Sequence, residues 1–238
     1  MMFVGSSEPS VLSLPDQIMA LSPLGYWKLD ENSGLPQDSS GNARHIASFG
    51  GTLNNTAGAD GENYAVRSSS QQDAREIDRD IWSPATSGTI TVFAIAYPTA
   101  RNATLNMVVG KWGTSQWEWA AGINTDGSVA VTRYNTSGAN VGELTSTTTP
   151  ASADDVWHTL TWVVQPAAAA ASLYHNGVKL TTNTPSGVMN TNGTLALSLW
   201  SHQQRFSGAI AHAAVFAGEM SDADIEDLHA SAAADGWF

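Results

Sequence analysis

Two tight-turn dipeptides, Asp126-Gly127 and Asn176-Gly177, each separate two short segments rich in β-branched and aromatic residues. Such dipeptides supply the positive-φ positions of a tight turn, so each predicts a β-hairpin. Further segments with the strand period of two recur between turn clusters from Gly25 onward. They occupy residues 89–97, 116–124, 128–134, 156–164, 172–175, 178–182, 194–200 and 209–217. Many short strands with few intervening helices predict an all-β fold, a two-sheet antiparallel jelly-roll sandwich.

One short helix is expected near the C-terminus. Ser221 offers an N-cap oxygen, and Asp222 and Asp224 place acids at the positive end of the helix dipole. Ile225 and Leu228 give this helix a short apolar stripe.

The chain of 238 residues is expected to form one domain, residues 23–238, preceded by an N-terminal arm, residues 1–22. Within the arm, Leu14-Pro15-Asp16 is turn-like, and a helical turn is expected only at residues 17–21. The strand at 89–97, which should end at a proline, is apolar on both faces, whereas a sandwich strand needs only one apolar face. Its second face is covered either by the arm or by another subunit.

Charge and composition narrow the classes of partner. Ten Lys and Arg face twenty-two Asp and Glu, for a formal net charge of −12. Such a surface repels phosphate backbones and anionic headgroups, so neither nucleic acid nor a membrane is an expected partner. The chain has no cysteine, and residues 1–10 lack the basic region of a signal peptide, so no export signal is expected.

Five motifs follow one another between residues 24 and 230. They are G-Y-W-K-L-D-E at 25–31, D-S-S-G-N at 38–42, D-V-W-H at 155–158, L-Y-H-N-G at 173–177 and F-S-G at 206–208. This order resembles the concanavalin A-like lectin/glucanase superfamily, in particular its laminin G-like and pentraxin-type jelly rolls. The resemblance implies the fold, but it leaves the function open among lectins, glucanases, adhesion modules and phage structural proteins.

The lead-in at residues 13–27 is similar to the openings of laminin G-like minor tail or decoration proteins of actinobacterial phages. This resemblance implies a non-enzymatic virion surface protein, made in the host cytoplasm, which is either a capsid decoration or a minor tail protein. Its implied partners are other virion proteins, in a homo-oligomer or symmetric assembly, and host-cell glycans. The expected assembly anchor is the set of apolar arm residues Phe3, Val11, Leu14 and Ile18. A free carbohydrate-binding lectin-like module is the alternative, and a glycan hydrolase ranks third.

Catalytic residues are not predicted. Retaining glycosidases need two carboxylates about 5–5.5 Å apart, and the E-x-D-x-x-E strand that supplies them in glucanases of the resembled superfamily is absent. Glu118 is the one acid inside a convincing predicted strand, and we expect it on a solvated outer face. The six histidines lie near no nucleophile and no metalloprotease spacing. Among them His158 lies on the same face of its predicted strand as Leu160 and Trp162, so its side chain is expected to pack in the core.

Calcium is the one cofactor considered. Asp30, Asp38 and Asn42 carry oxygen donors of the kind that Ca²⁺ prefers, and the resemblance implies a structural calcium in many relatives. Where such relatives place an acid after the F-x-G motif, this chain has Ala211-His212. The alternative is that the D-S-S-G-N loop forms an Asx turn bonded to its own backbone.

Two expected loops combine an aromatic ring with polar side chains, as sugar-binding sites do. The candidate glycan-binding residues are Trp112 and Gln116 in the first, and Trp200, His202, Gln204 and Arg205 in the second. The alternative is that Trp112 and Trp200 close the ends of the core. Packing is the role expected of the other tryptophans considered, which are Trp27, Trp117, Trp119, Trp157 and Trp162.

Overall fold

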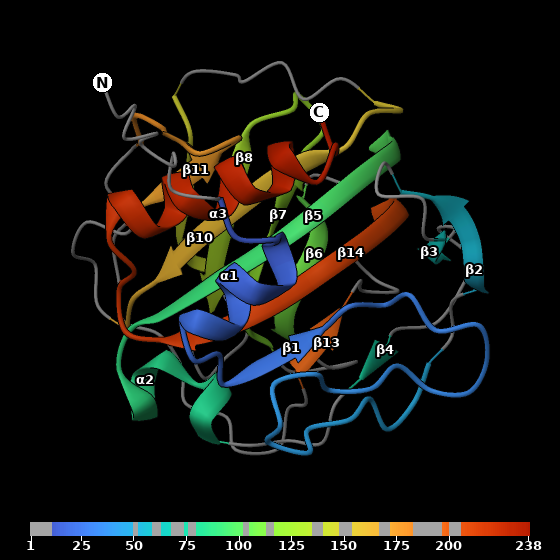
Figure 1. The fold of residues 1–238 in the computed structure, drawn as a ribbon. Coiled ribbons are helices and arrows are strands. Elements are labelled where there is room, and N and C mark those ends of the chain that lie inside the picture. The colour runs from blue at the N-terminus through green and yellow to red at the C-terminus, as the bar shows by residue number, and fades with distance from the viewer. Residues whose placement is uncertain are drawn as a thin grey trace, which may run out of the picture.

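The computed structural model describes residues 11–49, 52–58, 63–67, 74–75, 80–101, 105–112, 117–134, 140–147, 154–166, 172–182, 197–199 and 206–238. Over these residues the chain forms two stacked antiparallel sheets, and helices α1 and α3 lie across the outer face of the larger sheet (Figure 1). The predicted two-sheet jelly-roll sandwich is confirmed.

The larger sheet has the strand order β12-β11-β10-β5-β14-β3-β2, and β1 pairs with β14. Its strands are β1 (Gly25–Trp27), β2 (Thr52–Ala57), β3 (Asn63–Arg67), β5 (Ile90–Arg101), β10 (His158–Val164), β11 (Leu173–His175), β12 (Val178–Lys179) and β14 (Phe206–Ala217). The expectation that β5 ends at Pro98 was wrong. The strand continues because Pro98 lies opposite Gly208 at a register shift in β14, where a missing N–H breaks no regular ladder bond.

The smaller sheet has the order β4-β13-β6-β7-β8-β9. Its strands are β4 (Ala74–Arg75), β6 (Leu105–Trp112), β7 (Trp117–Asn124), β8 (Val129–Tyr134), β9 (Asn140–Thr145) and β13 (Leu197–Leu199).

Both predicted hairpins are present, β7–β8 and β11–β12. Asn176 and Gly177 both have positive φ, of 49° and 75°. In the other turn Gly127 is in that region, with φ of 87°, and Asp126 is not among the positive-φ residues. The Asp126 carboxylate instead accepts bonds from the backbone N–H and hydroxyl of Ser128, which fixes a longer turn.

Tryptophans fill the space between the two sheets. Trp27, Trp82, Trp119 and Trp162 are all fully buried in this central cluster. The indole of Trp119 donates to the carbonyl oxygen of Trp82, 2.9 Å away, where Trp82 ends the 3₁₀ turn η1 (Asp80–Trp82) that precedes α2 (Pro84–Ser87). The packing roles predicted for Trp27, Trp119 and Trp162 are confirmed.

The outer face of the larger sheet carries a second apolar cluster, covered by α1 (Leu14–Ala20) and α3 (Asp222–Ala234). Phe93 and Ile95 of β5 lie in this cluster together with Leu14 and Ile18 of α1 and Leu228 of α3. The second apolar face of β5 is therefore covered by the chain's own arm and its C-terminal helix. No helix among the described residues is long and apolar enough to span a membrane.

The arm differs from its prediction in two ways. Its helix begins at Leu14, because Ser13 caps it and Pro15 stands in the first turn, where a missing N–H costs nothing. Leu14 and Ile18 are fully buried, so assigning them to an anchor that meets a partner was wrong. The backbone N–H of Leu14 donates to the carboxylate of Asp235, 2.8 Å away, which joins α1 to the end of α3.

Candidate functional site

Most of the predicted glycan-binding residues lie outside the part of the chain that the structure describes. Gln116, Trp200, His202, Gln204 and Arg205 lie outside the described residues, as does the anchor residue Phe3. The backbone of Trp112 is described, as the last residue of β6. Sugar contact by Trp112 and by the five undescribed glycan-binding candidates therefore stays a prediction.

Strand register nevertheless separates the two predicted loops. Strand β13 runs antiparallel to β6, with Leu197 opposite Lys111 and Leu199 opposite Val109. The chain therefore leaves β6 after Trp112 in one direction and leaves β13 in the opposite direction. The two loops start from opposite ends of this strand pair.

The candidate calcium loop is bonded to itself. The Asp38 carboxylate accepts from the backbone N–H groups of Tyr26, Ser40 and Arg44, at 3.0, 2.9 and 2.9 Å, and from the Ser40 hydroxyl at 2.8 Å. Burial alone raises the pKa of Asp38, but these hydrogen bonds outweigh burial and hold its pKa below the usual range. A calcium ion would need the same lone pairs. The geometry is that of the alternative, a self-bonded Asx loop.

The other two candidate ligands do not change this result. The Asn42 amide nitrogen donates to the carbonyl oxygens of Pro23 and Leu24, at 3.1 and 3.2 Å. Asp30 is partly exposed beyond the end of β1. Among the described residues no three His, Asp or Glu side chains are grouped to hold a metal ion.

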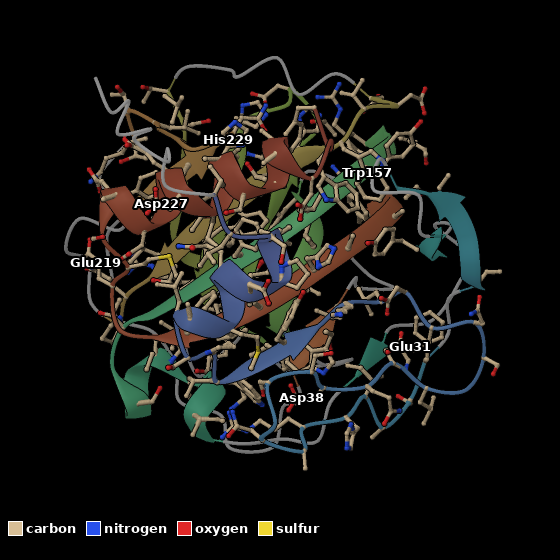
Figure 2. The ribbon with its side chains drawn as sticks, viewed as in Figure 1. Glu31, Asp38, Trp157, Glu219, Asp227 and His229 are labelled. Atoms are coloured by element: carbon tan, nitrogen blue, oxygen red, sulfur yellow. The ribbon has the colours of Figure 1, made fainter. Side chains whose placement is uncertain are left out.

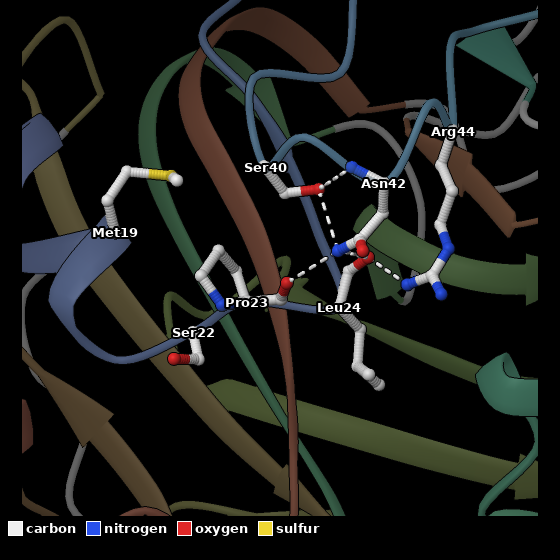
Figure 3. Close-up of a pocket in the computed structure, with 7 residues that line it drawn as sticks. All are labelled: Met19, Ser22, Pro23, Leu24, Ser40, Asn42 and Arg44. Atoms are coloured by element: carbon white, nitrogen blue, oxygen red, sulfur yellow. Dashed lines mark hydrogen bonds between the residues drawn. The ribbon is translucent and has the colours of Figure 1, made fainter.

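A pocket of about 390 Å³ lies between the end of α1 and this loop (Figure 3). The described residues that line it are Met19, Ser22, Pro23, Leu24, Ser40, Asn42 and Arg44. Its volume lies within the range of ligand sites, about 300–1,000 Å³. Ser22, which lines the pocket, and Ala43, which lies between the lining residues Asn42 and Arg44 in the chain, have positive φ of 55° and 54°, a strained conformation that clusters at functional sites.

Polar and apolar groups both face this pocket. The guanidinium of Arg44 donates to the carbonyl oxygen of Leu24 (Figure 3) and lies over the ring of Trp82, with Cζ 5.3 Å from the ring centroid. Met19 and Ser22 are exposed to solvent. None of the described lining residues carries a carboxylate or an imidazole. The pocket can therefore hold a polar ligand, but these residues offer it no acid or base.

Glu118 was predicted wrongly. It is fully buried, as is Lys111, whose Nζ lies 3.4 Å from the Glu118 carboxylate. The hydroxyl of Ser83 bridges the pair, accepting from Lys111 at 2.6 Å and donating to Glu118 at 3.1 Å. Burial of a carboxylate requires such partners, and these come from another strand and from a distant turn. No substrate reaches a carboxylate enclosed in this way.

Two histidines meet in the larger sheet, His158 of β10 and His175 of β11, and a third, His229, lies on α3 (Figure 2). His158, buried as predicted, and His175 approach to 3.0 Å between Nδ1 and Nε2. Nδ1 of His229 lies 3.0 Å from the hydroxyl oxygen of Thr159. Burial, and then the charges of His158 and His229, lower the pKa of His175 to about 4.

An aromatic group, which we call the aromatic platform, lies where β5 ends and β10 begins. It consists of Tyr64, Tyr97, Trp157 and Trp237. The ring centroid of Trp157 lies 5.1 Å from that of Tyr97, 4.9 Å from that of Trp237 and 6.1 Å from that of Tyr64. Tyr64 and Trp237 are buried, whereas Tyr97 and Trp157 are partly exposed. The packing role predicted for Trp157 therefore holds for part of its surface.

Several solved structures have this fold. The binding domain of paraclostridial mosquitocidal protein 1 is 15% identical, with a TM-score of 0.64, over 91% of this chain and 52% of that one. Domain 4 of AbnA, a GH43 extracellular arabinanase from Geobacillus stearothermophilus, in complex with arabinotriose, is 19% identical, with a TM-score of 0.63, over 87% of this chain and 98% of that one. The binding domain of botulinum neurotoxin DC in complex with SialylT is 14% identical, with a TM-score of 0.62, over 89% of this chain and 52% of that one.

The chain thus spans about half the length of the two toxin domains and nearly all of the arabinanase domain. No curated protein sequence is recognisably similar to it. The model of one family, described as the concanavalin A-like lectin/glucanases superfamily, matches residues 60–226, more than half of the chain. Its two-sheet jelly roll agrees with that match, and the chain belongs to the concanavalin A-like lectin/glucanases superfamily.

Proposed function

We propose that the chain is a non-catalytic carbohydrate-binding module, and that it holds its ligand in the pocket between α1 and the 38–44 loop. One observation carries the proposal: the pocket combines hydrogen-bonding and apolar groups, and its described lining has no acid or base. A glycosidase needs two carboxylates about the reacting bond, whereas a binding site does not.

The lining suits the two sides of a sugar ring. Ser22 places an exposed hydroxyl, and Asn42 its amide oxygen, where sugar hydroxyls can bond. Met19 and Leu24 provide apolar surface for the C–H face of the ring. The similar domain of the arabinanase was solved in complex with arabinotriose, which supports a sugar as the class of ligand.

The test is a glycan array followed by calorimetry with the oligosaccharides that bind. Met19→Ala combined with Ser22→Ala should weaken binding about tenfold, the loss of one hydrogen bond and part of an apolar contact. Leu35→Ala is the matched control, because Leu35 and Met19 are both 41% exposed and Leu35 is not among the lining residues. A wild-type protein that binds nothing on a broad array would refute the function. Unchanged affinity of the double variant would refute the pocket.

We also propose that this module acts as a surface protein of a phage virion, as a capsid decoration or a minor tail protein, attached through residues 1–12. Residues 13–27 resemble the openings of such proteins. Val11 and Leu12, immediately before α1, are 59% and 45% exposed and so remain accessible to a partner. Since Leu14 and Ile18 are buried, the proposed anchor keeps Phe3 and Val11 of the predicted set and gains the exposed Leu12.

Deleting residues 1–12 tests this attachment and leaves Ser13 to cap α1. The truncated protein should keep the melting temperature of the full chain and lose its place on particles. Full occupancy of the truncated protein on particles would refute the anchor.

A further inference from the structure

The aromatic platform lies far from the proposed pocket. Figure 2 labels Trp157 beside the C-terminal end of α3 and Asp38, which marks the pocket's loop, at the opposite end of the domain. Tyr97 and Trp157, its two partly exposed rings, come from β5 and from the turn before β10. Their centroids are 5.1 Å apart and their planes are inclined by 53°. The two partly exposed rings therefore lie in contact with each other.

The base of the aromatic platform is fixed from beneath. Trp237 meets Trp157 edge-on, at 83° between the planes. Tyr64 packs against both tryptophans, and its hydroxyl lies 3.0 Å from Nε2 of the buried His212. Rings that are already held in place lose little conformational freedom on binding, so more of the contact energy appears as affinity.

The turn that carries Trp157 is strained and tied down. Asp155 has a φ of 64°, a region that side-chain-bearing residues rarely adopt, and its N–H donates to the carbonyl oxygen of Pro98 at 2.7 Å. Next to it, Arg101 Nε and the Asp154 carboxylate form an ion pair at 2.9 Å, with side chains 20% and 35% exposed. Backbone strain persists where the surrounding structure enforces it, and it clusters at functional sites. Here the strained turn carries both Asp154 of the ion pair and the partly exposed ring of Trp157.

We propose that Tyr97, Trp157 and the Arg101–Asp154 pair form a second carbohydrate-contact surface, which stacks the apolar face of neutral sugars. It rests on the proposed carbohydrate-binding function but not on the pocket. Aromatic rings beside hydrogen-bonding groups match the two sides of a sugar.

Charge selects the class of sugar. Arg101 is already paired with Asp154, Asp155 is exposed beside them, and the whole chain carries a formal charge of −12. A sialylated or uronic-acid glycan would meet uncompensated negative charge at this surface. A neutral oligosaccharide meets no such penalty.

The test uses the full chain and calorimetry with arabinotriose, cellotriose, maltotriose, triacetylchitotriose and sialyllactose. Trp157→Ala should weaken binding of the preferred neutral sugar about fivefold to tenfold, and Trp157→Phe, which keeps a ring, should restore most of it. Leu35→Ala again serves as the control on a remote exposed residue. Preference for sialyllactose would overturn the sugar class.

A measurement on the wild type keeps the proposal testable if Trp157→Ala unfolds. Nuclear Overhauser effects should join the C–H protons of the bound sugar to the rings of Trp157 and Tyr97. Sugar binding without such effects would overturn this surface and leave the proposed function standing. No binding of any glycan, here or on the array, would refute both.

Discussion

Replacing Ile18 with alanine tests whether α1 is part of the fold or a detachable arm. Ile18 is fully buried in the cluster that also contains Phe93 and Leu228. Truncating a fully buried Ile to Ala costs about 2–5 kcal/mol, because apolar contact is lost and a cavity remains. Alanine regains about 0.4 kcal/mol through its higher helix propensity. We therefore expect Ile18→Ala to lower the free energy of unfolding by about 3 kcal/mol.

Urea unfolding followed by tryptophan fluorescence measures this loss. Val11→Ala is the matched control, since Val11 is apolar, lies in the same arm and is 59% exposed; it should change stability by no more than about 0.5 kcal/mol. For a domain of this size, 3 kcal/mol corresponds to a melting temperature lower by about 6–12 °C. If Ile18→Ala is as stable as Val11→Ala, α1 does not pack on the sheet in solution and residues 14–21 return as candidates for the anchor.

Three further results are expected. Burial and neighbouring histidines lower the pKa of His175 from 6.5 to about 4, so between these pH values the native state binds fewer protons than the unfolded chain. The contribution of His175 to stability is therefore complete above pH 6.5 and is lost as the pH falls toward 4. The loss is about 1–2 kcal/mol after allowance for the partial exposure of the ring. Urea midpoints at pH 7 and 4.5 should show this fall, and equal falls in wild type and His175→Gln would contradict its origin. Gly122→Ala should destabilise by more than about 2 kcal/mol, since its Cβ would stand 2.2 Å from the Asn106 carbonyl oxygen; a melting temperature like that of the wild type would refute the close approach. Lys111→Met alone should cost about 3–5 kcal/mol by stranding a buried carboxylate, and adding Glu118→Leu should recover most of it in thermal melts; a double variant no more stable than Lys111→Met would contradict the pairing.

Strands and hairpins were accessible from the sequence because their signals are local. The alternation in β7 and β8 and the glycine between them lie within one short stretch of chain, and the hairpin followed directly. The start of α1 was missed for a local reason too. Leu14-Pro15-Asp16 favours a turn when considered alone, yet Leu14 and Ile18 stand four residues apart, the spacing of one helix face.

The burial of Glu118 could not be predicted in this way. Its partners are Lys111, across a hairpin, and Ser83, in a turn remote in sequence. The alternation of side chains along a strand predicts which face a side chain lies on, but it does not predict whether a cation from a distant segment lies on that face.

The proposed sites share this limit. The D-S-S-G-N loop is visible in the sequence, but its contact with the end of α1 depends on bonds from Asn42 to the carbonyl oxygens of Pro23 and Leu24. The aromatic platform draws its rings from four separate chain segments, including Tyr64 and Trp237. Proximity of this kind is a product of the whole fold.

The two proposed contact surfaces lie at opposite ends of the domain, so one short oligosaccharide cannot occupy both. Weak sites held apart on a rigid scaffold gain affinity only when the ligand repeats, because the second contact then becomes intramolecular. A polysaccharide or a densely glycosylated surface meets that condition, and a free trisaccharide does not. If the protein is displayed in many copies on one particle, affinity rises in the same way, since each copy adds a contact to the same glycan surface. The proposed glycan binding and the proposed virion display therefore favour each other on physical grounds, because modest individual affinities suffice where a repeating ligand meets a repeating array.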